Sequence, residues 1–130
     1  MSKTHGKVIY LAASWPRREY ANSIKTMMDA RYGIGWVQSD WLDPKITKDL
    51  SEEANAVRDL VQARDCGIMV QITGDKLSSG GRHTELGIAL ALDIPVIILG
   101  PKEQVFHNLP GIRFAKDMLE LFTILDPEFK

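Results

Sequence analysis

Glu85 is the residue whose surroundings in the sequence most strongly suggest chemistry. It follows the glycine-rich stretch 78–81 and stands in the first turn of an apolar helix expected over Thr84–Leu92. There the positive end of the helix dipole favours an ionised carboxylate, as a nucleophile or a transition-state stabiliser requires. An acid at such a position can equally do no more than stabilise the helix terminus, by a few tenths of a kcal/mol. The residues alone leave both interpretations open.

The glycine-rich stretch itself suits an anion, because backbone N–H groups and a helix dipole converge there. The loop after the first predicted strand adds Ser14, with Arg17 and Arg18 at the next helix start. Together these segments could hold a phosphate, although ordinary loop and capping residues explain them about as well. The pattern matches neither the P-loop nor the dinucleotide fingerprint. The candidate anion-binding residues of the stretch are Ser78, Ser79, Gly80 and Gly81.

Asp59 and three tryptophans are further candidates. Asp59 lies off the apolar stripe of its predicted helix, where a solvated acid is the simpler interpretation. Trp36 and Trp41 flank the loop after the second predicted strand. Indole rings near the carboxyl end of a strand can stack on a nucleobase, although tryptophans are more often part of a core, and Trp41 is the stronger candidate of the two. Trp15, in the loop after the first predicted strand, is a candidate substrate-binding residue.

The elements that must position these residues alternate between strands and helices. Nearly continuous apolar strands between helices are typical of a parallel sheet. The sequence therefore predicts one α/β domain over residues 1–130, Rossmann-like or flavodoxin-like, with a mostly parallel five-stranded sheet between helices. The strands are expected at Lys7–Ala13, Ile34–Gln38, Gly67–Thr73, Pro95–Leu99 and Ile112–Ala115, and the helices at Arg17–Arg31, Asp49–Arg64, Thr84–Leu92 and Lys116–Leu125.

In the second of these helices an apolar stripe is expected to face the core, formed by Leu50, Ala54, Val57 and Val61. Ligands of open α/β sheets bind outside the carboxyl ends of the strands. That rule brings together the segments that hold the polar clusters of this sequence. They are residues 13–15, the loop 39–48, the stretch 73–81 and the chain from Gly100 onward.

Composition narrows the class of partner. The chain has 130 residues, 45% of them hydrophobic and 25% charged, and a formal net charge of −1. Such a balance gives no electrostatic footprint for a nucleic acid polymer or an anionic membrane. The single cysteine, Cys66, fits a reducing compartment and a cytoplasmic location. The three histidines show no metal-ligand spacing, so neither a metal nor a cofactor is expected.

Five motifs follow one another along the chain: VIYLAAS at residues 8–14, Asp59-Leu60, the strand 68–73, GGRHTELGIALAL at 80–92 and Pro95-Val96. In this order they resemble the nucleoside 2-deoxyribosyltransferase-like superfamily, which includes N-glycosidases of nucleoside monophosphates. The similarity spans roughly residues 7 to 125, and the stretch 100–110 further resembles a bacterial and phage branch.

The resemblance implies a role for each candidate. Glu85 matches the glutamate that attacks the anomeric carbon, and Asp59 matches an aspartate that assists proton transfer to the leaving base. Ser14 matches a ligand-contacting position, and the stretch 78–81 matches the loop that holds the 5′ end of the sugar or a 5′-phosphate. The resemblance also implies a homo-oligomer, in which Asn108 is a candidate to complete a neighbour's site.

Two departures keep the substrate class open. The first loop reads Ala13-Ser14-Trp15-Pro16, unlike the glycine-proline-phenylalanine of the transferases, and Gly67 replaces an acid. Arg17, Arg18 and Arg82 favour a phosphorylated substrate. The expectation is an enzyme that breaks the N-glycosidic bond of a small-molecule nucleoside or nucleotide, by hydrolysis or by transfer. The alternative is a module of the same fold that binds or senses nucleotides without turnover.

Overall fold

A parallel sheet of four strands organises the molecule. The computed structural model describes residues 8–74 and 81–129. Its strands are β1 (Ile9–Ala12), β2 (Ile68–Ile72), β3 (Val96–Leu99) and β4 (Arg113–Ala115), paired in that order. Every residue of β1, β2 and β3 is buried, as their continuous apolar sequences require in a sheet covered on both faces.

The expected fifth strand, Ile34–Gln38, is not formed. A single parallel bridge joins Val37 to Ile9 on the side of β1 opposite β2. The Ile9 N–H donates to the Trp36 carbonyl at 2.8 Å, and the Gln38 N–H donates to the Ile9 carbonyl at 2.9 Å. Glycines 33 and 35 both have positive φ, which bends the backbone around this short contact. The segment therefore follows the edge of the sheet without extending it by a full strand.

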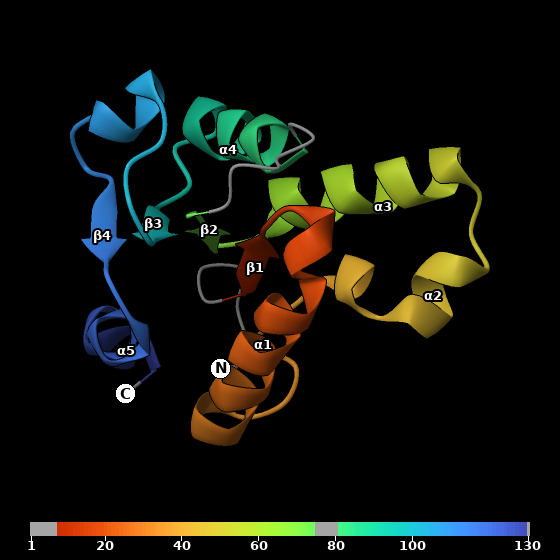
Figure 1. Ribbon diagram of the computed structural model, residues 1–130, viewed down its shortest axis with the longest axis horizontal. Coiled ribbons are helices and arrows are strands. Elements are labelled where there is room, and N and C mark those ends of the chain that lie inside the picture. The colour runs from red at the N-terminus through yellow and green to blue at the C-terminus, as the bar shows by residue number, and fades with distance from the viewer. Residues whose placement is uncertain (1–7, 75–80, 130) are drawn as a thin grey trace.

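The helices cover both faces of the sheet. On one side lie α3 (Glu52–Asp65) and α4 (Gly81–Ala91), and on the other lie α1 (Arg18–Tyr32) and α5 (Met118–Leu125), as Figure 1 shows. The short α2 (Pro44–Lys48) precedes α3 inside the predicted loop 39–48. It begins there because the Asp43 side chain caps it, accepting a hydrogen bond from the Lys45 N–H.

The orientation of α3 differs from the expected one. Val57 exposes 53% of its surface and Leu50 exposes 37%, whereas Ala54 and Val61 are half-buried, so only part of the predicted apolar stripe faces the core. Only Ala63 of this helix is fully covered. The helix instead turns polar side chains, Arg58 and Asp59 among them, toward a cavity at the end of the sheet. Amphipathic periodicity identifies an apolar stripe on a helix, but it does not determine which side of the helix packs against the rest of the molecule. Here polar residues of α3 face the cavity.

None of the helices in residues 8–74 and 81–129 is long and apolar enough to cross a membrane.

Candidate functional site

A cavity of about 370 Å³ lies at the carboxyl end of β1. The chain leaves β1 toward α1 and the edge segment on one side, and returns through α3 to β2 on the other. Such a reversal is the place where open α/β sheets bind ligands. The walls come from the loop after β1, the α2 region, α3 and the start of α4. They include Ala13, Ser14, Trp15, Trp41, Thr47, Asn55, Arg58, Asp59, Gly81, Arg82 and Glu85.

Glu85 lies in this cavity and bonds to the sheet beneath it. The hydroxyl of Tyr10, a fully buried residue of β1, donates a hydrogen bond to Oε2 of Glu85. Burial raises the pKa of Glu85 to about 8, the Tyr10 hydrogen bond partly opposes that rise, and the negative charge of Asp59 adds to it. Burial also raises the pKa of Tyr10, so its hydroxyl stays protonated and remains a donor.

The helix dipole does not set the ionisation of Glu85. The described part of α4 begins at Gly81, three residues earlier than expected, so Glu85 belongs to its second turn. The influence of the dipole fades within the first turn. Desolvation dominates instead: it favours the protonated carboxyl group of Glu85 and raises its pKa to about 8.

Asp59 reaches the same cavity from α3, where it forms an ion pair with its neighbour Arg58. Nε and Nη2 of Arg58 both donate to Oδ1 of Asp59, at 3.1 and 2.8 Å. Arg58 exposes 12% of its side chain and Asp59 exposes 33%. The structure thus brings together the two carboxyl groups that the sequence had singled out, from two different helices.

Two indole rings form an aromatic wall. Trp41 is buried and its Nε1–H donates to the Leu11 carbonyl at 2.9 Å, which fixes the ring. Trp15 is 47% exposed, and its ring centroid lies 6.3 Å from that of Trp41, tilted by 46°. The Arg18 guanidinium covers the Trp15 ring at 4.5 Å. Flat apolar surfaces of this kind suit a planar heteroaromatic ligand.

The remaining predicted residues divide into three groups. Ser14 and Gly81 line the cavity. Arg17 donates to the Thr73 carbonyl at 2.8 Å, and Asn108 donates to the Val105 carbonyl at 3.1 Å; neither residue lines the cavity. A third group, Ser78, Ser79 and Gly80, lies outside the described residues.

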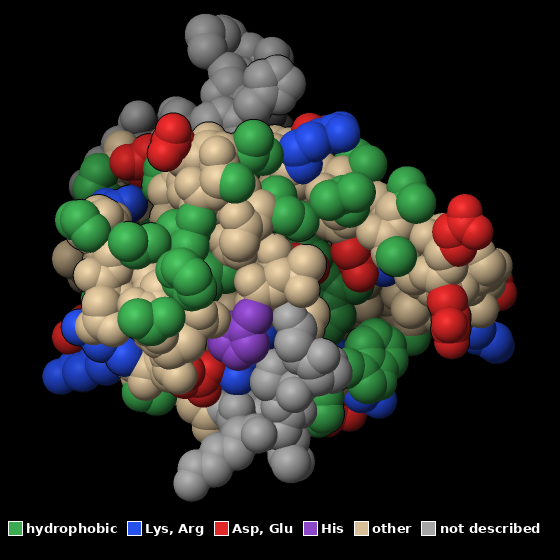
Figure 2. Space-filling view, turned by 90° about the horizontal axis from the view of Figure 1, so that it is seen from above, with side chains coloured by type: hydrophobic (Ala, Val, Ile, Leu, Met, Phe, Trp, Pro, Cys, Tyr) green, Lys and Arg blue, Asp and Glu red, His purple; other side chains and the backbone are tan. Residues whose placement is uncertain are grey.

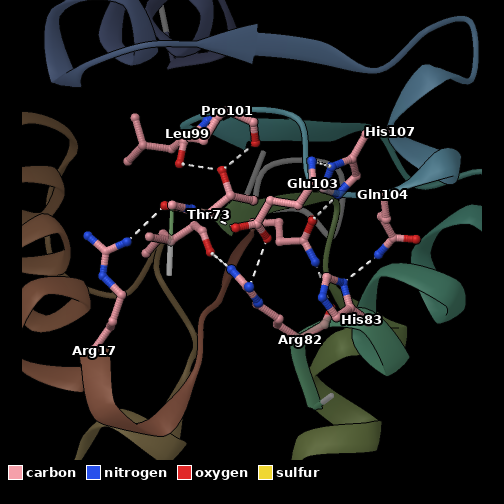
Figure 3. Close-up of polar contacts among 12 residues, drawn as sticks. Arg17, Thr73, Arg82, His83, Leu99, Pro101, Glu103, Gln104 and His107 are labelled. Atoms are coloured by element: carbon pink, nitrogen blue, oxygen red, sulfur yellow. Dashed lines mark hydrogen bonds and ion pairs between the residues drawn. The ribbon is translucent and has the colours of Figure 1, made fainter. Parts of the chain in front are cut away.

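Arg82, in α4, bonds to β2 and to the segment after β3 (Figure 3). Its side chain is 2% exposed, with Nη1 donating to the Ile72 carbonyl at 2.8 Å and Nη2 paired with Glu103 Oε1 at 2.7 Å. The Glu103 N–H donates to His107 Nδ1 at 3.0 Å, and His107 Nε2 lies 2.7 Å from Gln71 Oε1. Gln71 in turn donates to the Arg82 carbonyl at 3.0 Å. This closed ring fixes the start of α4, and with it Glu85, against β2.

Sequence reasoning missed Tyr10 and Arg58. Tyr10 carried a signal, because a phenol inside an otherwise aliphatic strand needs a hydrogen-bond partner when buried. Arg58 carried none, since arginine beside aspartate on a helix is usually a solvated pair.

The fold and the site together define a Rossmann-like α/β protein with a ligand-sized cavity at the carboxyl edge of its parallel sheet. Within residues 8–74 and 81–129, no group of three or more His, Cys, Asp or Glu side chains could hold a metal ion. Comparisons with protein-family models, with curated proteins and with solved structures find no match for the chain.

Proposed function

We propose that the protein breaks the N-glycosidic bond of a nucleoside, a deoxynucleoside or their 5′-monophosphates, with Glu85 as the nucleophile. One observation carries the proposal: Glu85 and Asp59, from separate helices, line one cavity that also has an indole wall. Breaking this bond passes through an oxocarbenium-like state, which needs a carboxylate near the sugar and an acid near the departing base.

The reaction has two steps. A carboxylate oxygen of Glu85 bonds to the anomeric carbon, the C–N bond breaks, and its electron pair passes to the base, which takes a proton from Asp59. Water or a second base then displaces Glu85 from the sugar, giving hydrolysis or transfer. Before the first step, the proton that Glu85 carries at its pKa of about 8 passes to Asp59, which leaves Glu85 ionised as the nucleophile and Asp59 neutral as the proton donor.

The second candidate is a nucleotide-binding or sensing module without turnover. The raised pKa of Glu85 favours this candidate, because a neutral carboxyl group bonded to Tyr10 can donate a hydrogen bond to a ligand without attacking it.

Incubation with the four deoxynucleosides and their 5′-monophosphates, each with and without a second free base, tests the proposal. Chromatography of released bases is expected to show release or exchange by wild type and a loss of at least about 100-fold in Glu85→Ala. Tight binding without base release, unaffected by Glu85→Gln, would instead support the binding module. Exchange only in the presence of a second base separates transfer from hydrolysis.

We also propose a cytoplasmic homo-oligomer that acts without a cofactor on a small-molecule nucleoside or nucleotide. Val57 and Leu60 support self-association, because they expose 53% and 50% of their surface on α3, the helix that carries Asp59. Figure 2 looks at the molecule from the side on which α3 and α4 lie in Figure 1, and hydrophobic side chains lie among polar ones there. Light scattering gives the solution mass, to be compared with 14.6 kDa for one chain.

A further inference from the structure

Arg58 and Asp59 form an unusual pair for two consecutive helical residues. Side chains at i and i+1 diverge on a helix and do not normally face each other. Here both side chains lie on the cavity side of α3, and Arg58 is the more buried of the two. The pair therefore belongs to the cavity wall and differs from an ordinary solvated pair.

The geometry treats the two oxygens of Asp59 differently. Oδ1 accepts both bonds from Arg58, at 3.1 and 2.8 Å, whereas no group among the described residues bonds to Oδ2. Two charge-assisted hydrogen bonds to one oxygen fix the rotation of a carboxyl group. Asp59 keeps 33% of its side chain exposed and lines the cavity, so Oδ2 is the oxygen left for a ligand.

Stability does not explain the pair. Nη1 of Arg58 is buried and has no hydrogen-bond partner among the described residues. A buried, unpaired N–H group costs free energy, and a largely buried ion pair is commonly no more stable than apolar residues of the same shape. An apolar side chain at position 58 would avoid that cost, and it would leave Asp59 unoriented.

We infer that Arg58 is a positioning residue, which holds Asp59 so that Oδ2 delivers a proton to the leaving base. The inference rests on the proposed function. Oδ2 first takes up the proton that Glu85 gives up. As the C–N bond breaks, its electron pair goes to the base nitrogen and the proton passes from Oδ2 to the base. Asp59 is left as a carboxylate, and the Arg58 guanidinium already faces it. Misplacing a proton donor by about 1 Å can cost roughly 100-fold in rate.

Substrates with different leaving groups test this role. Arg58→Met and Arg58→Lys are compared with wild type on deoxynucleosides and on 4-nitrophenyl 2-deoxyriboside, and on the 5′-phosphate of each. Nitrophenolate departs without protonation. Arg58→Met is expected to lower kcat about 10- to 100-fold with the natural bases, with KM changed less than about 3-fold. With the nitrophenyl substrates the loss should stay below about 3-fold, and Arg58→Lys should recover part of the activity on natural bases.

Arg64→Met is the matched control. Arg64 also bonds to the aspartate that follows it on α3, at 2.9 Å, but it is 54% exposed and does not line the cavity. This variant should behave as wild type with every substrate. Thermal unfolding should place Arg58→Met at or above wild type; if that variant fails to fold, Arg58→Gln replaces it.

Three results would overturn the inference. Equal losses of Arg58→Met on natural and nitrophenyl substrates would show a merely structural role. No loss on either would show no role. Release of neither base nor nitrophenolate by wild type would refute the proposed function, and the inference with it.

Discussion

At the scale of single residues, the protonation of Glu85 depends on opposing effects of its surroundings. Burial and the charge of Asp59 favour the neutral acid, and the Tyr10 hydroxyl favours the carboxylate. The hydroxyl belongs to the first strand and the carboxyl group to the fourth helix, 75 residues later. A nucleophile at this position therefore needs the strand beneath it as much as its own helix.

Tyr10→Phe is expected to raise the pKa of Glu85 above its value of about 8. The substitution removes the hydrogen bond that stabilises the carboxylate and leaves the burial that opposes it. A carbon-13 NMR titration of the Glu85 carboxyl carbon measures the change. Tyr20→Phe is the control, because Tyr20 is 41% exposed and lies outside the cavity. An unchanged or lower pKa in Tyr10→Phe would contradict the assigned role.

At the scale of elements, the turn after β3 holds the hydrogen-bonded ring of Arg82, Glu103, His107 and Gln71 against the sheet. Gly100 has a φ of +127°, a region that side chains rarely adopt. Its N–H donates to the Ala115 carbonyl at 2.9 Å, and Thr73 beside it donates to the Pro101 carbonyl at 2.7 Å. The chain then leads directly into Glu103, the partner of Arg82.

Gly100→Ala is expected to lower the free energy of unfolding by about 1–3 kcal/mol or more. An added Cβ would lie 2.9 Å from the Thr73 carbonyl oxygen, on a backbone that already disfavours it. Gly87→Ala is the control, since nothing lies within 4 Å of a Cβ there and the residue is helical. That variant should be up to about 1 kcal/mol more stable than wild type. Urea denaturation measures both, and equal stabilities of the two variants would refute the argument.

At the scale of the whole molecule, a buried acid links the site to folding stability. The pKa of Glu85 is about 8 in the folded protein and 4.5 as an ordinary glutamate. Between these values the folded state holds a proton that the unfolded state releases. The free energy of unfolding therefore falls as pH rises from about 4.5 to about 8, and the loss is complete above that range.

Glu85→Gln should remove this part of the pH dependence. From the two pKa values, the free energy of unfolding of wild type falls relative to that of Glu85→Gln by no more than about 5 kcal/mol, at roughly 1.4 kcal/mol per pH unit. Urea denaturation of both proteins at pH 5, 7 and 9 measures the difference. The free energy of unfolding of wild type is expected to fall relative to that of Glu85→Gln as pH rises. If the two proteins show the same dependence on pH, the Glu85 carboxyl group is not buried as described.

Local patterns were enough to locate most elements. The strands around Ile9, Ile68 and Val96 lie where continuous apolar sequence predicted them, and α1 and α5 lie within a few residues of their predicted ranges. A strand was predicted at Ile34–Gln38 because the segment has strand-like residues. The strand does not form, since only one bridge joins the segment to β1. The prediction also missed α2, whose start depends on the Asp43 cap.

The sequence by itself determined the α/β class and the parallel sheet, which follow from periodicity, and it marked Glu85 by its residue type and its place after a glycine-rich stretch. Asp59 became a candidate through the resemblance to a known superfamily. Only the tertiary structure decided that α3 turns its polar side inward, that Tyr10 lies under Glu85 and that Arg82 bonds to β2 and to the segment after β3. The tertiary structure also decided that Glu85 is buried, which raises its pKa to about 8. The physical reason is that desolvation, orientation and hydrogen-bond partners depend on contacts between residues far apart in the chain.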